Sequence, residues 1–283
     1  LGVHAICHMQ RVDDDDDSTD EAENDAENSV VSNIVRLYPQ AASVQDENGY
    51  QPLHHAVQNA YEWDDSIELI HTSHRLAVQT RANGSLPLHL AAASKKAGDS
   101  VIQHLLGLYP LALDMLDAQG CLAMHLGCYA GKEWDQGISF LFEARPESLR
   151  QPVAEKKGWL PLHFACASDE NSSKLICELV EHHPEAACVK DDDGNLPLHL
   201  ACQAGGKSWK EGLERLFHAN AIATSTVDGD GLLPLHVAAF RVCGGEDLDE
   251  ERPSWLADTS ASKSHGDLDV LYEILRADPA ALR

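Results

Sequence analysis

Six histidines recur along the chain at a nearly constant spacing, and histidine is a common zinc ligand and general base. The intervals between them are 35, 36, 38, 36 and 37 residues, and the set comprises His54, His89, His125, His163, His199 and His236. Zinc requires its nitrogen ligands within ~2.1 Å of one ion, whereas equivalent residues of neighbouring packed helices lie ~8–10 Å apart. We therefore predict no metal site, and we expect each imidazole to hydrogen-bond to backbone beside a turn.

Cysteines occupy a second repeated position, three residues after the motif histidine, at Cys128, Cys166 and Cys202. A cysteine beside a histidine can be a catalytic nucleophile, but an active site needs one such pair in one pocket, and here the pair recurs in several units. The stacking distance also forbids disulfides, whose Cα atoms lie ~4.4–6.8 Å apart. The sequence therefore predicts small core residues, no catalytic residue and no cofactor. A Cys/His hydrolase would require a single deep pocket.

The histidines belong to a longer repeated motif, Leu-Pro-Leu-His followed by an apolar residue and Ala or Gly. Proline suits the first helical position because its missing N–H would be unpaired there in any case. A turn precedes each copy, and the six turns end at Gly49, Gly84, Gly120, Gly158, Gly194 and Gly231. Apolar residues at helical spacing follow each motif, as in 101–106 and 175–180, and several of these segments stop before a proline. Each unit thus predicts a turn, a short helix, a loop and a longer helix.

This combination of period, turn glycine and Pro-Leu-His resembles the ankyrin repeat, which has a period of about 33 residues and a T-P-L-H-x-A signature. The resemblance covers nearly the whole chain. It implies an all-α fold, an ankyrin-type α-solenoid of stacked helix-turn-helix repeats, with β-turn fingers that line a concave surface together with the first helices. Leu or Gln replaces the Thr that caps the first helix in the family, so that side-chain cap is absent here. We expect the extra residues of each period in the loop between the helices.

We expect residues 1–283 to form a single array of about seven repeats, because an isolated unit cannot bury its own apolar face. A divergent first copy opens the chain as Leu1-Gly2-Val3-His4-Ala5. Acidic stretches without helical periodicity, at about 10–28 and 244–266, predict disordered loops that interrupt the first and last repeats. The chain lacks an initiator Met and ends where another finger should begin, so we expect a fragment of a longer protein.

The charge balance bears on the class of partner. Lys and Arg number 21 against 46 Asp and Glu, and the formal net charge of −25 disfavours nucleic acid and anionic lipid surfaces. No apolar run approaches the ~20 residues of a membrane-spanning helix. A protein or peptide partner is favoured instead, and electrostatic steering favours a basic one. Eight cysteines without a C-x-x-C pair predict reduced thiols and an intracellular, cytoplasmic location.

The residue after each turn glycine varies from copy to copy, as a recognition surface on a fixed scaffold requires. Candidate partner-binding residues are Tyr50, Ser85, Trp159, Asn195 and Leu232. Tyr50 and Trp159 are the first candidates for partner binding, because Tyr and Trp are enriched in binding hot spots. Packing on the neighbouring finger is an equally good explanation for these two side chains. Tryptophans near the start of the second helix could staple the inter-helix loop or form an exposed patch, and they are Trp63, Trp134 and Trp209.

These patterns predict a non-catalytic scaffold that binds a protein or peptide through its concave, finger-bearing face. The alternative is a targeting or regulatory region of a larger multidomain enzyme whose catalytic domain lies outside this chain. Residue types alone do not identify the partner, because one fold serves many functions.

Overall fold

The computed structural model describes residues 30–168, 173–205, 207, 212–243 and 265–277. The contacts between Cα atoms divide the chain into two compact units. Unit 1 comprises Leu1–Gly127 and Asp135–Pro146, and unit 2 comprises Cys128–Trp134 and Glu147–Arg283. The described residues form helices and turns without a sheet, and their two isolated β-bridges are Ala82–Ser85 and Val153–Trp159. The all-α prediction is therefore confirmed.

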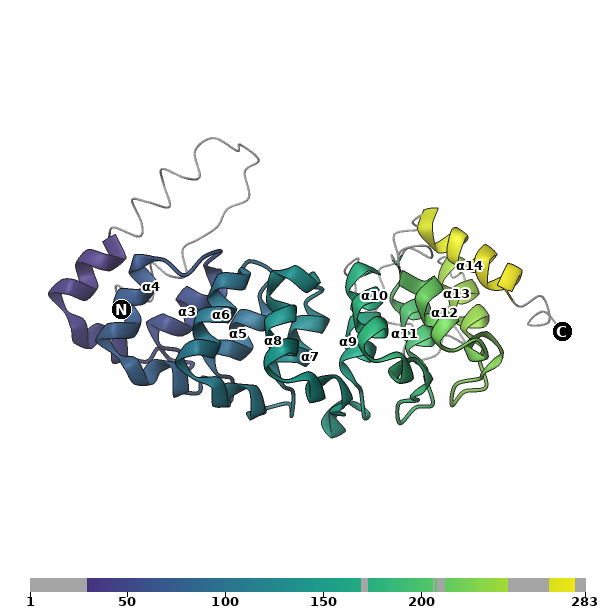
Figure 1. Cartoon of the computed structure of the whole chain (residues 1–283), viewed down its shortest axis with the longest axis horizontal. Helices are drawn as coiled ribbons and strands as arrows, with labels where there is room; N and C mark the ends of the chain where they lie inside the picture. The colour runs from purple at the N-terminus through teal and green to yellow at the C-terminus, as the bar shows by residue number, and fades with distance from the viewer. Residues whose placement is uncertain (1–29, 169–172, 206, 208–211, 244–264, 278–283) are drawn as a thin grey trace. The chain divides into compact units, whose positions relative to one another are not determined.

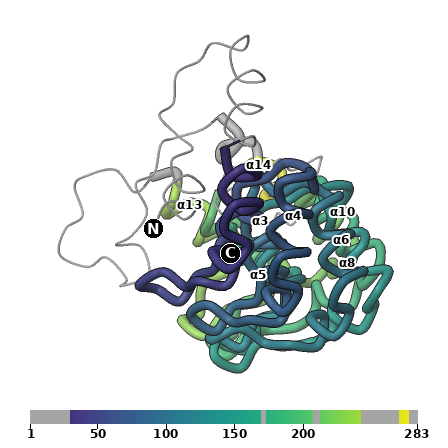
Figure 2. The backbone as a smooth tube through the Cα atoms, turned by 90° about the vertical axis from the view of Figure 1, so that its left-hand side faces the viewer, coloured from purple at the N-terminus to yellow at the C-terminus, as the bar shows by residue number. Residues whose placement is uncertain are grey.

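Unit 1 is built from pairs of helices (Figure 1). Its first helices are α3 (Pro52–Asn59), α5 (Pro87–Ala93) and the opening five residues of α7 (Ala123–Tyr129). Its second helices are the helix at 30–37, α4 (Asp65–Ser73), α6 (Asp99–Leu108) and α8 (Ser139–Ala144). Helix α3 packs on α4 and α5, α5 packs on α6, and α6 packs on α8. The view in Figure 2 shows α3 and α5 in one layer and α4, α6 and α8 in the layer beside it.

Unit 2 repeats the same pairing. Its first helices are α9 (Pro161–Ala167), α11 (Pro197–Ala204) and α13 (Pro234–Cys243). Its second helices are α10 (Ser173–His182), α12 (Glu214–Ala219) and α14 (His265–Ala277). Helix α11 packs between α9 and α13, while α9 packs on α10, α10 on α12, and α13 on α14. The predicted helix-turn-helix repeats are therefore present in sequential contact within each unit.

Proline and small apolar residues explain why the first helices form and pack closely. A proline occupies the first position of α3, α5, α9, α11 and α13, where it needs no hydrogen-bond donor. Ala91, Ala165 and Ala201 are buried in α5, α9 and α11, so the backbones of neighbouring helices approach one another. Buried leucines such as Leu88 and Leu162 contribute roughly 1.5–3 kcal/mol each to folding.

The second helices end as the sequence predicts, but the chain stays helical beyond the stop. Prolines begin short 3-10 turns at Pro39–Ser43, Pro110–Asp114, Pro146–Arg150 and Pro184–Cys188. Buried alanines anchor these turns, including Ala42, Ala112 and Ala186. Arg75–Gln79 forms an equivalent turn without a proline, because the buried Ala77 and Val78 still fix it. Pro279 lies outside the described residues.

Several sequence predictions fall where the structure gives no description. The divergent copy at Leu1–Ala5, the acidic stretch at 10–28 and Trp209 lie outside the described residues. Most of the second acidic stretch, 244–264, does so as well, and α14 begins at His265, just inside the predicted loop. A single array over 1–283 therefore stays a prediction.

Candidate functional site

Each motif histidine is hydrogen-bonded to backbone through its ring. Nδ1 accepts from the backbone N–H three residues earlier, at 3.0 to 3.1 Å, in His54, His89, His125, His163, His199 and His236. Nε2 lies 2.9 to 3.2 Å from a carbonyl oxygen of the following finger segment, in the pairs His54–Thr80, His89–Met115, His163–Val189 and His199–Leu232. Because Nδ1 faces a donor, we assign the proton of these four rings to Nε2, which donates to the carbonyl.

The motif histidine also supplies one of the two hydrogen bonds of a capping box. It stands at the third helical position and reaches back to the N–H of the capping residue, a bond that Glu or Gln makes in a capping box. The capping residue itself, Leu86 for α5, makes no side-chain cap. Burial lowers the pKa of His54, His89 and His199, and it lowers the pKa of His163 to about 4. These four imidazoles are therefore neutral near pH 7 and serve as backbone clamps.

Four of the fingers are turns built on an aspartate. Oδ1 of the first residue accepts N–H bonds from the residues two and four positions later, at Asp46, Asp117, Asp191 and Asp228. The turn glycine has a φ between 73° and 82° in these four fingers, which glycine adopts without strain. The two residues that precede the glycine are exposed in every one of these fingers: 47–48, 118–119, 192–193 and 229–230. Each finger thus presents a two-residue tip on a fixed backbone.

The residue after the glycine lies behind the tip. All five candidate binding residues are half-buried, namely Tyr50, Ser85, Trp159, Asn195 and Leu232, and Cys121 in the same slot is buried. In the aspartate fingers, the N–H of this residue is one of the two that Oδ1 holds, so the chain turns back toward the helices there. The pattern Asp-x-x-Gly in the sequence indicates such a turn, because Asp bonds to nearby backbone and Gly accepts positive φ. A role in binding for the five residues stays a prediction.

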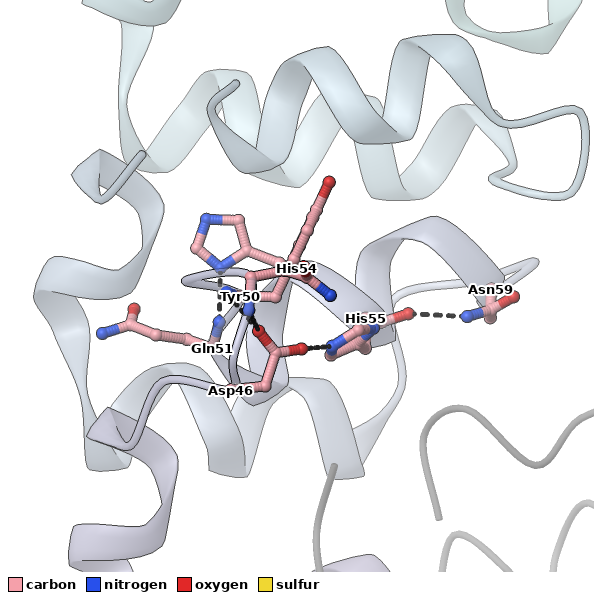
Figure 3. Close-up of polar contacts among 7 residues, drawn as sticks. Asp46, Tyr50, Gln51, His54, His55 and Asn59 are labelled. Atoms are coloured by element: carbon pink, nitrogen blue, oxygen red, sulfur yellow. Dashed lines mark hydrogen bonds and ion pairs between the residues drawn. The ribbon is translucent and has the colours of Figure 1, made fainter. Parts of the chain in front are cut away.

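Tyr50 packs against histidines of its own repeat (Figure 3). Its ring centroid lies 5.9 Å from that of His54 and 5.3 Å from that of His55. Nε2 of His55 lies 2.9 Å from Oδ2 of Asp46, the aspartate that also holds the Tyr50 N–H. The finger at 46–50 is therefore tied to α3 by side chains as well as by its backbone.

Trp159 connects two fingers of unit 2. Its Nε1 donates to Oδ2 of Asp191 at 2.9 Å, and its ring meets Phe164 edge to face with the centroids 5.3 Å apart. Phe164 also contacts Tyr129, at 6.3 Å between centroids. We call Tyr129, Phe164 and Trp159 the aromatic row. Tyr129 is 54% exposed, Phe164 is only 4% exposed and Trp159 is half-buried, so the buried ring lies between two more exposed ones.

Tyr129 and Phe164 are two residues of this row that the repeat motif does not indicate by itself. Their signal was their place relative to the motif histidine: Tyr129 follows His125 by four residues, at the end of α7. Phe164 directly follows His163 in α9. Both positions can be counted from the repeat, but only the packing shows that the two rings meet Trp159.

The fingers of unit 2 are also joined through their backbones. The N–H of Asp192 donates to the carbonyl of Lys157 at 2.9 Å, and the N–H of Gly229 donates to the carbonyl of Asp193 at 2.8 Å. The Lys157 ammonium pairs with the Asp193 carboxylate. The three fingers at 153–159, 191–195 and 228–232 therefore form one hydrogen-bonded edge.

Two of the predicted tryptophans staple the helices. Trp63 stacks on His104 of α6 with the centroids 5.3 Å apart, and Trp134 stacks on His182 of α10 at 4.9 Å. Both indoles are half-buried. Each links an inter-helix segment to the second helix of the following repeat, which favours stapling over an exposed patch.

The repeated cysteines are poorly suited to catalysis. Cys128 and Cys166 are fully buried, and burial raises the pKa of both thiols, that of Cys166 to about 12. A thiol that stays protonated near pH 7 is a weak nucleophile. Within the described residues, no group of three or more His, Cys, Asp or Glu could hold a metal ion. No helix in that part of the chain has the length and apolar character to cross a membrane.

Comparison with known proteins places these repeats in context. No family model matches the chain. The ankyrin repeat domain-containing protein SAT10 of Stachybotrys chartarum is 25% identical over 143 residues, an alignment that spans 50% of this chain and only 7% of that protein. The crystal structure of the ankyrin repeat domain of Bcl-3 matches with a TM-score of 0.54 and 18% identity, covering 92% of this chain and 100% of that domain.

A second solved structure is the predatory endopeptidase Bd0816 from Bdellovibrio bacteriovorus in complex with the immunity protein Bd3460. A chain of that complex matches with a TM-score of 0.53 and 14% identity. The match covers 69% of this chain and 91% of that one.

Proposed function

Because this chain has the fold of an ankyrin repeat domain, we propose that it is a non-catalytic module that binds a protein or peptide through its fingers and first helices. The observation that carries the proposal is the construction of the fingers. The same aspartate turn fixes four backbones, while the exposed tips differ: Glu47-Asn48, Ala118-Gln119, Asp192-Asp193 and Gly229-Asp230. A constant frame with variable tips suits recognition.

The chemistry of the repeated residues supports binding over catalysis. Four motif imidazoles use both ring nitrogens in backbone bonds, and the pKa of each is lowered by burial. The buried thiols of Cys128 and Cys166 are held protonated. Neither set offers a base or nucleophile to a substrate.

A structural neighbour adds support for protein binding in general. The matched chain comes from a complex between an endopeptidase and an immunity protein, two protein components. The strong acidity of this chain favours a basic partner through electrostatic steering.

The test begins with affinity capture of a partner by the intact chain, followed by measurement of the purified complex. Double substitution of Glu47 and Asn48 to Ala, or of Asp192 and Asp193 to Ala, should weaken binding at least about tenfold if that tip is a hot spot. Matched controls are Gln103→Ala and Glu181→Ala, exposed positions on second helices. Circular dichroism verifies that every variant is folded.

The proposal fails if all tip variants bind like the intact chain while a second-helix control loses affinity. Tyr50→Ala and Trp159→Ala belong in the same series. Their side chains also make contacts within the fold, so affinity must be compared at equal folded fraction.

The alternative is that this array targets or regulates a larger enzyme. The curated relative gives it one observation in favour, because only 7% of that protein aligns with this chain. Sequencing the complete reading frame decides it: the absence of a catalytic domain would remove the alternative. A cytoplasmic location is likewise part of the proposal, and it is tested by imaging the tagged full-length protein.

A further inference from the structure

Two of the six fingers carry asparagine directly before the turn glycine, and Asn48-Gly49 and Asn83-Gly84 are the two Asn-Gly pairs of the chain. Asparagine is a labile residue, and a following glycine favours its deamidation because no Cβ hinders attack by the glycine nitrogen. We propose that Asn83 is a site of spontaneous deamidation in the folded protein, whereas the structure of its finger protects Asn48. This modification does not depend on the proposed function, because it requires no partner.

The reaction needs only water as a co-reactant. The backbone nitrogen of Gly84 forms a bond to the side-chain carbon Cγ of Asn83 and gives up its proton, while the bond from Cγ to the amide nitrogen breaks and ammonia leaves. Water then opens the five-membered succinimide ring at one of its two carbonyl groups. Opening at Cγ gives aspartate, and opening at the backbone carbonyl gives isoaspartate, in which the main chain runs through the former side chain. Either product adds one negative charge to the finger.

Hydrogen bonds hold the peptide group that would react at Asn48. The Gly49 N–H, whose nitrogen would attack, donates to the carbonyl of Asp46 at 3.0 Å. Oδ1 of Asp46 also accepts from the N–H groups of Asn48 and Tyr50, at 2.9 and 2.8 Å. The Gly49 bond must therefore break before the nitrogen can reach the carboxamide of Asn48.

The finger at 81–85 is built differently. Arg81 stands where the first finger has an aspartate, and Ala82 and Ser85 each donate a backbone N–H to the carbonyl of the other at 2.9 Å. Asn83 and Gly84 form the two-residue loop between them, with φ angles of 48° and 83°. Among the residues that the structure describes, none accepts a hydrogen bond from the Gly84 N–H or bonds to the Asn83 carboxamide. The attacking nitrogen is therefore not held by a bond of the fold.

Exposure to solvent does not distinguish the two sites. Asn48 and Asn83 are both exposed, and each is followed by a half-buried glycine. The two sites share their residue types and their exposure, and they differ in the hydrogen bond on the attacking nitrogen. Breaking one ordinary hydrogen bond corresponds to a factor of roughly 2 to 10 in an equilibrium constant. We therefore expect Asn83 to deamidate faster than Asn48 by a factor of that size.

The two products should affect the finger differently. Aspartate precedes the turn glycine in two other fingers, at Asp193 and Asp230, so this product fits the fold. Isoaspartate adds one carbon to the main chain of a two-residue loop whose ends are paired. The backbone of Gly84 already lies against the next finger, since a Cβ there would stand 2.6 Å from the Cβ of Ala118. Isoaspartate should therefore loosen the finger at 81–85, which hydrogen exchange at its paired amides measures.

The test incubates the intact chain at pH 8 and follows both asparagines in the same molecules by peptide mass spectrometry. Deamidation of Asn83 should be roughly 2- to 10-fold faster than that of Asn48. A parallel incubation in urea removes the protection, so the rate at Asn48 should approach that at Asn83. The proposal is overturned if Asn48 reacts as fast as Asn83 in the folded protein, or if Asn83 reacts only in urea.

Two variants tie the rates to the structure. Asp46→Ala removes the carboxylate that holds the first finger, so it should accelerate deamidation at Asn48 and leave the rate at Asn83 unchanged. Asn83→Gln is the resistant control, because glutamine would have to close a six-membered ring. A long side chain is accepted before a turn glycine at positive φ, as Lys157 shows with a φ of 57°. An isoaspartate-specific methylation assay should lose most of its signal in Asn83→Gln, and an undiminished signal would place the reactive site elsewhere and overturn the proposal.

Discussion

Acidification should destabilise this protein through histidines that are buried without charge. His163 has no exposed surface, its Nδ1 accepts from Leu160, and its Nε2 lies 3.1 Å from the carbonyl of Val189. Burial lowers its pKa from 6.5 to about 4. Because the pKa in the folded state is the lower one, the unfolded chain takes up the proton first as the pH falls. The contribution of neutral His163 to stability is therefore complete above about pH 7. It is lost as the pH falls from about 6.5 to 4, and below that the free energy of unfolding stays at its reduced value.

The size of the effect follows from the two pKa values. Between pH 7 and pH 5, His163 alone should remove about 2 kcal/mol from the free energy of unfolding, and the limit below pH 4 is about 3 kcal/mol. The lowered pKa values of His54, His89 and His199 act in the same direction. Such a loss is a large share of the ~5–15 kcal/mol that holds a typical domain folded.

His163→Gln isolates this contribution. Gln at the third helical position can keep the bond to the Leu160 N–H, as in a capping box, but it does not titrate. The variant should lose about 0.5–1.5 kcal/mol at pH 7, because the hydrogen bond from the buried imidazole to the Val189 carbonyl is lost. Its further loss on going to pH 5 should be smaller than that of the parent by about 2 kcal/mol.

Urea unfolding at both pH values, followed by circular dichroism, measures these differences. Hydrogen exchange at 161–167 assigns them to α9, which matters because a repeat array need not unfold in one step. The control is His218→Gln, whose side chain is 66% exposed. An unchanged pH dependence in His163→Gln, or an equal change in His218→Gln, would refute the reasoning.

Two further predictions concern packing. Gly229→Ala should lower the free energy of unfolding by about 1–3 kcal/mol, because the new Cβ would lie 2.3 Å from the Asp193 carbonyl oxygen. Thermal unfolding measures this change, and a variant as stable as the parent would contradict the close approach. Gly107→Ala in α6 is the matched control and should raise stability by up to ~1 kcal/mol, since a Cβ there meets nothing within 4 Å. Iodoacetamide at pH 8 should modify the exposed Cys188 but spare the buried Cys128 until urea is added. Peptide mass spectrometry measures the modification of each cysteine. Equal modification of the two cysteines in the folded protein would show that Cys128 is accessible.

The fold could be predicted from sequence because its determinants are local and repeated. Pro-Leu-His marks the start of a helix, and α5, α9 and α11 begin at the prolines of that motif. Gly at the end of each turn meets a need for positive φ, which depends on the backbone alone. A signal that recurs six times also averages out the ambiguity of any single copy.

The candidate site could be predicted only in part, because exposure depends on packing between repeats. Trp159 is bound by Asp191, 32 residues away, and no pattern near Trp159 indicates that partner. Tyr129 reaches Trp159 only through Phe164 of another helix. Such contacts are set by how repeats stack, so sequence could place the fingers but not which of their residues face outward.

The hydrogen bond from a motif histidine to the next finger segment fixes the number of residues between the histidine and its acceptor. Its acceptor lies 26 residues after the histidine in three repeats, those of His54, His89 and His163. The same repeats measure 35, 36 and 36 residues from one histidine to the next, so the odd residue falls in the finger and not between the helices. An insertion between the helices must bulge outward without shifting the carbonyl, whereas the finger that follows can lengthen and leave these three bonds intact. The length of a finger, and with it the exposed surface of the finger, can therefore change without breaking the hydrogen bonds that hold neighbouring repeats together.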